Sequence, residues 1–527
     1  MHQPDTAEEK ILFETGPIRE SQSGSNPSYI DRFTLGAFWN LVSTIGAKLT
    51  AFIGAVIVAR FLGKEGYGEL AIIQSTIGML GIFAGFGIGG TAIKYVAELR
   101  FKDPERAGRI IGLTYLVSWT AGGLMALGCF LAAPWVATRT INAPHLAPEI
   151  RLASLLLFVS AGFGPQTGIL SGFQAFRALA KINWWTPLLS LPVTVALVWL
   201  AGLRGVILSL IFTALFGAAL ASLALRREYR SSGIRPNFRE AWYDRYVLWR
   251  FSLPTFLANI SYSPVLWAAN ALLANQPRGY SELGVFNACM QFKWMITGIN
   301  SVLAAVSLPI LSEIYGQNDE GRFARAINLN LRLNWGLAIT LGFLILGFSP
   351  WLIQLFGDKF KSGSPVMGLV ICSIVVDVAC GIVGQTLFSS GRTWYSLGIH
   401  LLWGAFLLSA GLMLVPAYGA LGLAAAFIIS YSMILIGQLL LVSNLFGRTA
   451  TSNIIPSVIF CCLLILCGLF SVTHITSYLF NIVLIILALL NCTVLINYNI
   501  AIFKNIFHNY ASTAALKLGR NYGGRKS

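Results

Sequence analysis

Residues 33–62 read FTLGAFWNLVSTIGAKLTAFIGAVIVARFL, and this stretch decides the class of fold. Its only charged residues are Lys48 and Arg60, and most of the others are apolar or small. A helix of about 20 such residues is long enough to cross the hydrocarbon core of a bilayer. The stretch therefore predicts a transmembrane helix that carries one lysine near its middle.

The same kind of stretch recurs along the whole chain. The 527 residues are 56% hydrophobic and only 11% charged, with a mean hydropathy of +0.70. A water-soluble domain cannot bury that much apolar surface. Because the runs are continuously apolar and do not alternate, they predict helices and exclude the strands of a membrane barrel. We expect an all-α polytopic membrane protein with about 14 spans, at residues 34–60, 68–92, 110–134, 152–173, 183–201, 205–225, 251–274, 284–307, 333–356, 365–388, 397–415, 419–443, 454–473 and 477–500.

Lysine and arginine in the connections predict the orientation. With the N-terminus in the cytoplasm, 27 of the 37 basic residues lie in cytoplasmic tails and loops, 8 lie outside, and two lie within spans. Both termini are therefore expected to be cytoplasmic, in a multi-pass protein of a bacterial inner membrane. The net charge of +16 follows from this asymmetry, so it does not indicate a nucleic-acid partner.

An internal repeat divides the spans into two halves. EGYGELAIIQ (65–74) matches RGYSELGVFN (278–287) at an offset of 213 residues, and six spans lie on each side of a basic connector near residue 235. Six is an even number, so both halves enter the membrane in the same direction, as in transporters built from parallel repeats. We therefore expect two six-helix lobes related by a pseudo-two-fold axis along the membrane normal, plus two extra C-terminal helices.

This plan predicts the domain boundaries. The connector carries the densest basic stretch, RREYRSSGIRPNFREAWYDRY (226–246), which we expect to touch anionic lipid. All eight cysteines fall in apolar spans, so neither a disulfide framework nor a metal site is indicated, and no cofactor is expected. The expected parts are a cytoplasmic tail (1–33), an N-lobe (34–225), a cytoplasmic linker (226–250), a C-lobe (251–443), helices 13 and 14 (454–500) and a basic cytoplasmic tail (501–527).

Lys48 is the first candidate for a functional side chain. A helix that starts at residue 34 rises roughly 21 Å before it reaches Lys48, which puts the ammonium group near the bilayer centre. A central lysine costs about 3 kcal/mol to insert, so it should face protein or water. Asn40, Thr44 and Lys48 recur every four residues and share one polar face. The alternative is a structural lysine, paired with a buried carbonyl or an acid.

The second half of the chain contains the other two deep charges. Lys293 has no lysine counterpart in the repeat, because the position 213 residues earlier is Leu80. Asp377 is the one acid placed deep in a span, and it is either a proton or cation site or the counter-ion of a lysine. Two cations and one acid favour an anion, and a phosphate suits a lysine. The polar residues expected to line the same cavity are Asn259, Tyr262, Asn270, Asn287, Gln291, Thr297 and Asn300.

The stretch GFGIGG (85–90) fits the dinucleotide-binding pattern G-x-G-x-x-G. That pattern carries meaning where it links a strand to a helix, whereas here it ends an apolar span. Close packing of helices at small residues explains it better.

Several motifs near the N-terminus resemble a known family. Ala59-Arg60-Phe61-Leu62-Gly63, then Gly66-Tyr67-Gly68, then GFGIGGTAIKYVAE (85–98) are similar to the Wzx-type flippases, in the polysaccharide-transporter branch of the MOP exporter superfamily. The resemblance implies two lobes that alternate between inward- and outward-open states. It implies a polyprenyl-diphosphate-linked oligosaccharide as substrate, a basic cavity for the diphosphate, and membrane lipid around the prenyl tail. A polysaccharide polymerase complex is a further expected partner.

Two relatives of these flippases and one enzyme class are the alternatives. Multidrug antiporters of the superfamily commonly carry a carboxylate in the first helix, where this chain has Lys48. Peptidoglycan-precursor flippases have fourteen helices and a basic cavity, but typically begin with an arginine-rich motif that this chain lacks. A membrane glycosyltransferase would need a sizeable outward loop with acidic or arginine residues, and the outward loops here are short. We therefore expect a transporter and not an enzyme.

Overall fold

The computed structural model of the protein describes residues 29–85, 87–253, 256, 260, 262–317, 319–390, 392–451, 454–473 and 480–497. Every regular element within these residues is a helix, which confirms the all-α class. Nine helices in the described part are long and apolar enough to cross a membrane. Three of them contain a glycine at which two helices join, so the count of about 14 crossings stays a prediction.

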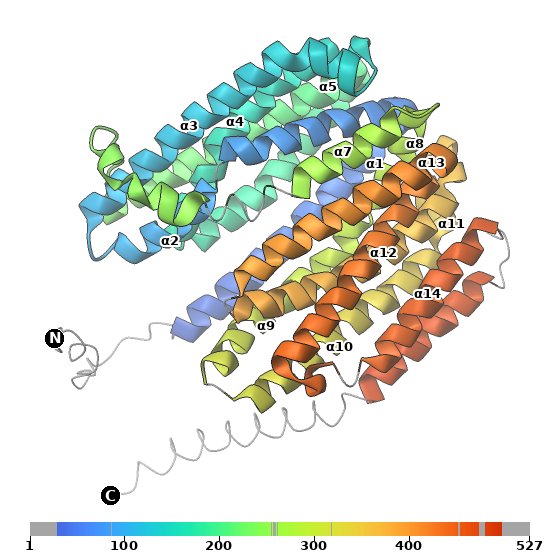
Figure 1. Ribbon diagram of the computed structural model, residues 1–527. Helices are drawn as coiled ribbons and strands as arrows, with labels where there is room; N and C mark the ends of the chain where they lie inside the picture. Colours follow the sequence, from blue (N-terminus) through green and yellow to red (C-terminus); the bar gives the residue numbers. More distant parts are fainter. Residues whose placement is uncertain are drawn as a thin grey trace, which may run out of the picture.

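The helices gather into two lobes, joined along one side of the molecule (Figure 1). The N-lobe consists of α1 (Tyr29–Gly85), α2 (Ile88–Leu99), α3 (Pro104–Trp135), α4 (Ala147–Gly172) and α5 (Phe176–Ser232), with a π-helix (Val136–Thr140) and a 3₁₀-helix (Pro144–Leu146) between α3 and α4. The C-lobe consists of α7 (Tyr262–Ala274), α8 (Gly279–Met290), α9 (Lys293–Gly316), α10 (Glu320–Gly347), α11 (Ser349–Gln354), α12 (Ser364–Ser389) and α13 (Thr393–Phe446), with 3₁₀-helices at Asp358–Gly363 and Arg448–Ala450.

Two further helices, α14 (Ile455–Thr473) and Phe480–Asn497, pack on α10 and α12 of the C-lobe. The Asn491 amide donates hydrogen bonds to the carbonyl oxygen of Gly336 and to Thr340 Oγ1, each at 2.9 Å. A Cβ on Gly336 would lie 2.4 Å from the Leu495 side chain, and one on Gly468 would lie 2.5 Å from Cys372 Sγ. Small residues therefore allow the extra helices to lie close against the C-lobe, as is usual between helices in a membrane.

Two matched glycines show the internal repeat in the backbone. Gly202 inside α5 has φ 54° and ψ −128°, and Gly419 inside α13 has φ 55° and ψ −127°. A second glycine, Gly205 or Gly422, follows three residues after each of them. A Cβ on Gly205 would lie 1.8 Å from the Leu197 carbonyl oxygen, and one on Gly422 would lie 2.2 Å from the Leu414 carbonyl oxygen. A residue with a side chain rarely adopts such a positive φ, so glycine is needed for both turns. The two lobes therefore contain the same tight helix–turn–helix connection 217 residues apart.

The lobes cross where α1 passes α8. A Cβ on Gly68 would lie 1.9 Å from the Tyr280 carbonyl oxygen, and one on Gly284 would lie 1.8 Å from the Lys64 carbonyl oxygen. Hydrogen bonds surround the crossing: Tyr280 Oη to the Ile141 carbonyl (2.6 Å), Asn275 Nδ2 to the Thr140 carbonyl (2.7 Å), and Arg60 Nε to the Leu355 carbonyl (2.6 Å). This set of contacts, defined here as the lobe junction, lies at the end of the lobes that contains the Gly63 turn.

The connection between the lobes is fixed to the N-lobe. A Cβ on Gly108 or Gly112 of α3 would lie 2.4 or 2.2 Å from carbonyl oxygens of the connection, and the buried Asp244 accepts hydrogen bonds from the Nε atoms of Arg106 (3.1 Å) and Arg109 (3.0 Å). The short helices of this connection are Ala241–Asp244 and Leu248–Ser252. The connection is therefore packed against α3 of the N-lobe.

Some boundaries differ from the sequence expectation. The ninth span was expected at 333–356, but α10 begins at Glu320 and ends at Gly347. Arg332, which lies just before the expected span, is 8% exposed and belongs to α10. The eighth span was expected as one helix over 284–307, but it is broken between α8 and α9.

The glycine-rich stretch also has a clear role. Gly87, with φ 66°, is the residue that directly precedes α2. A Cβ on Gly168 of α4 would lie 2.6 Å from the Gly89 carbonyl oxygen, so α2 and α4 pack closely there. This agrees with the prediction of close helix packing.

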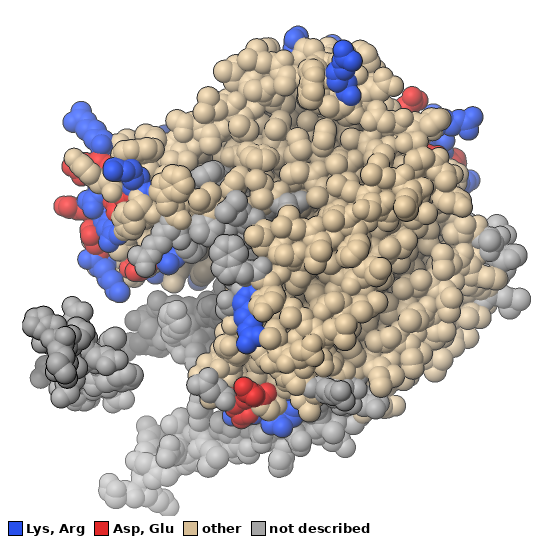
Figure 2. Space-filling view, in the orientation of Figure 1, with Lys and Arg blue, Asp and Glu red and all other residues tan. Residues whose placement is uncertain are grey.

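The surface fits a membrane environment. In Figure 2 the charged side chains gather mainly toward the left and right ends of the molecule, and a broad uncharged surface lies between them. Large apolar side chains such as Leu131, Trp199 and Met413 are 68, 73 and 80% exposed. Apolar side chains that face outward over such an area indicate contact with lipid.

Candidate functional site

The deep charges of the C-lobe form an ion pair. Lys293 Nζ lies 2.5 Å from Asp377 Oδ2, and the two side chains are 23% and 24% exposed. Lys293 is the first residue of α9, directly after the break at Gln291–Phe292, and Asp377 lies in the middle of α12. The structure therefore pairs Asp377 with a lysine, one of the two roles expected for it, and that lysine is Lys293.

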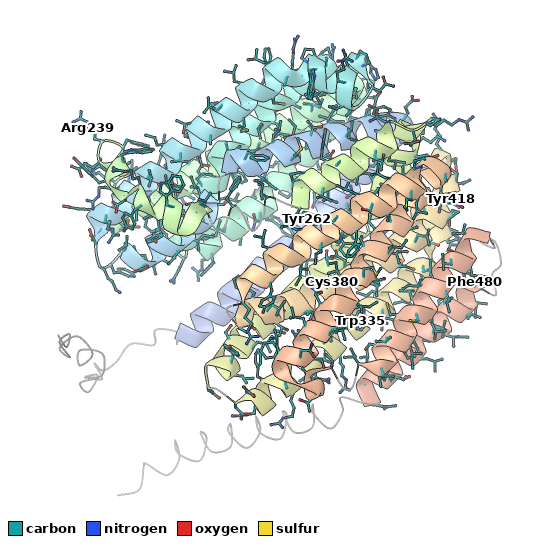
Figure 3. The ribbon with its side chains drawn as sticks, viewed as in Figure 1. Arg239, Tyr262, Trp335, Cys380, Tyr418 and Phe480 are labelled. Carbon is teal, nitrogen blue, oxygen red and sulfur yellow. The ribbon has the colours of Figure 1, made fainter. Side chains whose placement is uncertain are left out.

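Aromatic side chains from two other helices enclose this pair. The Tyr262 ring of α7 stacks on Trp403 of α13 with centroids 5.2 Å apart, and Trp403 stacks on Tyr431 at 5.5 Å. The Lys293 ammonium lies 5.8 Å from the centroid of the Tyr431 ring, within range of a cation–π interaction. The Tyr262 hydroxyl lies near both Lys293 and Tyr431. Figure 3 shows Tyr262 on the side of the C-lobe that faces the N-lobe.

Trp403 and Tyr431 are the residues of this site that the sequence did not suggest. Both are buried, at 3% and 5% exposure, and Trp403 Nε1 has no hydrogen-bond partner among the described residues. Trp403 lies in an apolar stretch of α13 and Tyr431 lies between Ser430 and Ser432, and an aromatic residue in such a span usually belongs to the core. Only the packing of α13 on α12 brings them to the ion pair.

Lys48 reaches the same helix from the N-lobe. Its side chain is half-buried, and its Nζ and Cδ atoms lie 3.4 and 3.6 Å from the place where Gly298 of α9 would carry a Cβ. Gly298 follows Lys293 by five residues, which is about 7.5 Å along the helix axis and about 140° around it. Lys293 therefore extends from α9 toward α12, and Lys48 of α1 approaches α9 at a neighbouring level but on a different face.

The other expected lining residues have varied surroundings. Asn287, Thr297 and Asn300 donate to carbonyl groups of their own helices, and Asn300 Oδ1 is buried with no hydrogen-bond partner among the described residues. Gln291 donates to Tyr67 Oη of α1 at 3.0 Å, so it belongs to the contacts between the lobes. Asn270 is half-buried on α7. Asn40 and Thr44 lie in α1, but their side chains, and all of Asn259, lie outside the described residues.

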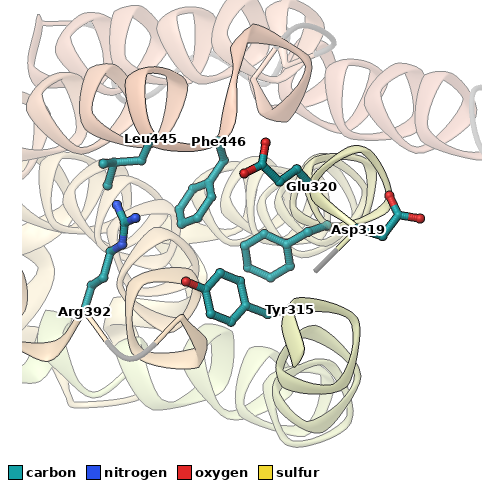
Figure 4. Close-up of a pocket in the computed structure, with 7 residues that line it drawn as sticks. Tyr315, Asp319, Glu320, Arg392, Leu445 and Phe446 are labelled. Carbon is teal, nitrogen blue, oxygen red and sulfur yellow. The ribbon is translucent and has the colours of Figure 1, made fainter. Parts of the chain in front are cut away.

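A pocket at the far end of α9 is separate from these residues (Figure 4). It is lined by Tyr315, Asp319, Glu320, Phe323, Arg392, Leu445 and Phe446. Tyr315 follows Lys293 by 22 residues, or about 33 Å of helix. This distance separates the pocket from the ion pair. Within the pocket, the Arg392 guanidinium lies 5.3 Å from the centroid of the Phe446 ring.

The described residues contain no group of three or more His, Cys, Asp or Glu side chains that could hold a metal ion. The charged groups described above are the Asp377 carboxylate, the Lys293 ammonium group beside it and the Lys48 ammonium group near Gly298. Carboxylate and ammonium groups of this kind can bind and release charged ligands.

Comparison with known proteins gives a consistent result. The family model described as "Polysaccharide biosynthesis protein" matches residues 33–315, more than half of the chain. A succinoglycan biosynthesis transport protein of Rhizobium meliloti (strain 1021) is 24% identical over 386 residues, covering 73% of each chain. A lipid III flippase of Escherichia coli (strain K12) is 24% identical over 413 residues, covering 75% of this chain and 94% of the flippase.

A solved structure shares the fold. It is the inward-facing conformation of a multidrug resistance MATE family transporter of the MOP superfamily, with a TM-score of 0.64 and 15% identity, and the match covers 79% of this chain and 99% of that one. At this identity the likeness concerns the fold alone. The resemblance inferred from the sequence is confirmed, and so is the expectation of a transport protein and not an enzyme. The chain is therefore a member of the polysaccharide biosynthesis protein family and has the fold of the MOP superfamily.

Proposed function

We propose that the protein flips a polyprenyl-diphosphate-linked oligosaccharide from the cytoplasmic to the outer leaflet of the inner membrane, for assembly of a surface polysaccharide. The observation that carries this proposal is the position of Lys48. It is a cation deep in a span, and it approaches α9, the helix that begins with Lys293, across the boundary between the lobes. Two cations against one acid leave a positive excess in the membrane interior, which favours an anionic cargo.

The diphosphate is the part of the cargo that these lysines recognise. Lys48 and Lys293 contact it from the N-lobe and the C-lobe, and each contact is stronger in a low-dielectric cavity than at a surface. The hydrated sugar lies among the polar residues expected at the lobe boundary, which are Asn40, Thr44, Asn259, Tyr262, Asn270, Asn287, Gln291, Thr297 and Asn300. The prenyl tail stays in lipid beside α14 and the helix Phe480–Asn497. Asp377 is the position at which a coupling ion acts.

Alternating access requires the lobe junction to open. The bonds of Tyr280 and Asn275 to the N-lobe backbone, and of Gln291 to Tyr67, then break while the lobes close at the opposite end. The lobes over 34–225 and 251–443 would move as bodies about the linker over 226–250. Both termini lie in the cytoplasm in this scheme, and a polysaccharide polymerase complex receives the flipped product.

The test is complementation of surface-polysaccharide assembly in a strain that lacks its own flippase, with membrane abundance measured for every variant. Lys48→Ala should abolish assembly at normal abundance, whereas Lys48→Arg should retain part of it because a guanidinium also holds phosphate. Lys361→Ala is the matched control, since Lys361 is 54% exposed and pairs with an exposed aspartate. Lys293→Ala leaves Asp377 without its counter-ion, so it is made together with Asp377→Asn.

Normal assembly by the Lys48→Ala, Lys293→Ala and Asp377→Asn triple variant would disprove the anion site. Unchanged assembly combined with a drug-sensitive phenotype would favour a multidrug antiporter. Failure restricted to peptidoglycan synthesis would favour a peptidoglycan-precursor flippase. These outcomes separate the three transport functions that the shared fold permits.

A further inference from the structure

We propose that Asp377 is an exchangeable counter-ion of Lys293, so that one proton is taken up when an anionic lipid diphosphate replaces the Asp377 carboxylate at the ammonium group. The proposal rests on the flippase function given above and deepens it. Its geometric basis is the 2.5 Å contact between Lys293 Nζ and Asp377 Oδ2. About a quarter of each side chain is exposed, so an approaching ligand can reach both of them.

The neighbouring ionisable side chains add no full charge to this pair. Among the described residues, the ionisable side chains that act on it include Tyr262 of α7, Tyr431 of α13 and Cys380 of α12. A tyrosine or cysteine side chain in an apolar setting stays neutral at physiological pH. One ammonium group is therefore balanced by one carboxylate. The three neutral side chains do not change that charge balance.

A second anion at this place is unfavourable while Asp377 is ionised. Removing a charge from water costs several kcal/mol unless an opposite charge lies close by, and one ammonium group cannot fully compensate both a carboxylate and a phosphate. Like charges a few ångströms apart favour protonation of one of them. A carboxylate that gains a proton becomes neutral, and Lys293 is then free to contact the phosphate.

The direction of the pH effect follows from this exchange. Ligand binding that takes up one proton becomes tighter as the pH falls and weaker as it rises. The uptake of one proton changes the affinity by up to about tenfold per pH unit. The stacked rings of Tyr262, Trp403 and Tyr431 lie beside the pair within the C-lobe.

The test measures binding of farnesyl diphosphate to the full-length protein in lipid nanodiscs between pH 5.5 and pH 8.5. Asp377→Asn should bind the probe as tightly as the wild type at the acid end and at least tenfold more tightly at the alkaline end. The probe itself titrates, and the slope that remains in Asp377→Asn reports that contribution. Asp244→Asn is the matched control, because it removes another buried acid that pairs with basic side chains but lies at the linker. It should keep the wild-type slope.

The outcomes separate this inference from the proposed function. If the wild type binds the probe through Lys293 but Asp377→Asn keeps the wild-type slope, the counter-ion exchange is wrong and the flippase proposal survives. If farnesol binds as well as farnesyl diphosphate, and Lys48→Ala and Lys293→Gln change nothing, the anion site itself is wrong. Asp377→Asn can unfold because it strands Lys293, so the Lys293→Gln, Asp377→Asn double variant is included. It should melt like the wild type and bind weakly at every pH, and tight pH-dependent binding by it would also overturn the proposal.

Discussion

Gly68→Ala should loosen the lobe junction, and the size of the effect can be worked out from the packing. The added Cβ would lie 1.9 Å from the Tyr280 carbonyl oxygen, whereas real Cβ atoms essentially never approach closer than 3.0 Å. Helices α1 and α8 must therefore part by about 1.1 Å at the crossing, and the obstacle is backbone, which cannot rotate away. Overpacking of this kind costs typically about 1–3 kcal/mol. Because this cost falls only on the state in which the junction is closed, it should shift the equilibrium toward the open state by about 5- to 150-fold.

The shift can be measured as a distance across the junction. Spin labels at Trp135 and Trp351, which are 62% and 47% exposed, would report the separation of the lobes at this end in a background without the eight native cysteines. Gly78→Ala is the matched control on the same helix, because nothing lies within 4 Å of its added Cβ. We expect a longer and broader distance distribution for Gly68→Ala and an unchanged one for Gly78→Ala. Identical distributions and equal melting temperatures for the two variants would refute the reasoning.

Two further predictions test the repeat and the orientation. Gly202→Ala and Gly419→Ala both force a side chain into a positive φ, which should cost about 1–2 kcal/mol each. Gly419→Ala should melt lower than Gly202→Ala, because its Cβ also meets the Glu282 carboxylate that accepts the Ala420 amide hydrogen at 2.5 Å, whereas Gly202 faces open space; equal melting temperatures would contradict this. Reporters fused near Arg235 and after Lys517 should give cytoplasmic signals and one near Asn142 an outside signal, and a cytoplasmic signal at Asn142 would overturn the orientation.

The sequence by itself determined the class of fold, because the thickness of a bilayer sets the length of an apolar run and each run can be recognised without its neighbours. It also predicted the repeat, since EGYGELAIIQ and RGYSELGVFN keep their likeness whatever their surroundings. The two turns at Gly202 and Gly419 agree with that repeat to within one degree in φ and ψ. The ninth span was expected to begin at residue 333, whereas α10 begins at Glu320, and Arg332 is buried within it by packing that an apolar run does not reveal.

The sequence singled out candidate residues one by one, but not their arrangement. Lys48, Lys293 and Asp377 stood out because charge is costly in hydrocarbon, and that cost depends only on depth in a span. Which charges meet depends on how each helix is rotated and how helices distant in sequence pack. Tertiary structure alone decided that Asp377 pairs with Lys293, that Trp403 and Tyr431 enclose the pair, and that Lys48 approaches α9 on another face. The physical reason is that insertion into the membrane is a local property of each span, whereas the pairing of side chains is a property of the packed bundle.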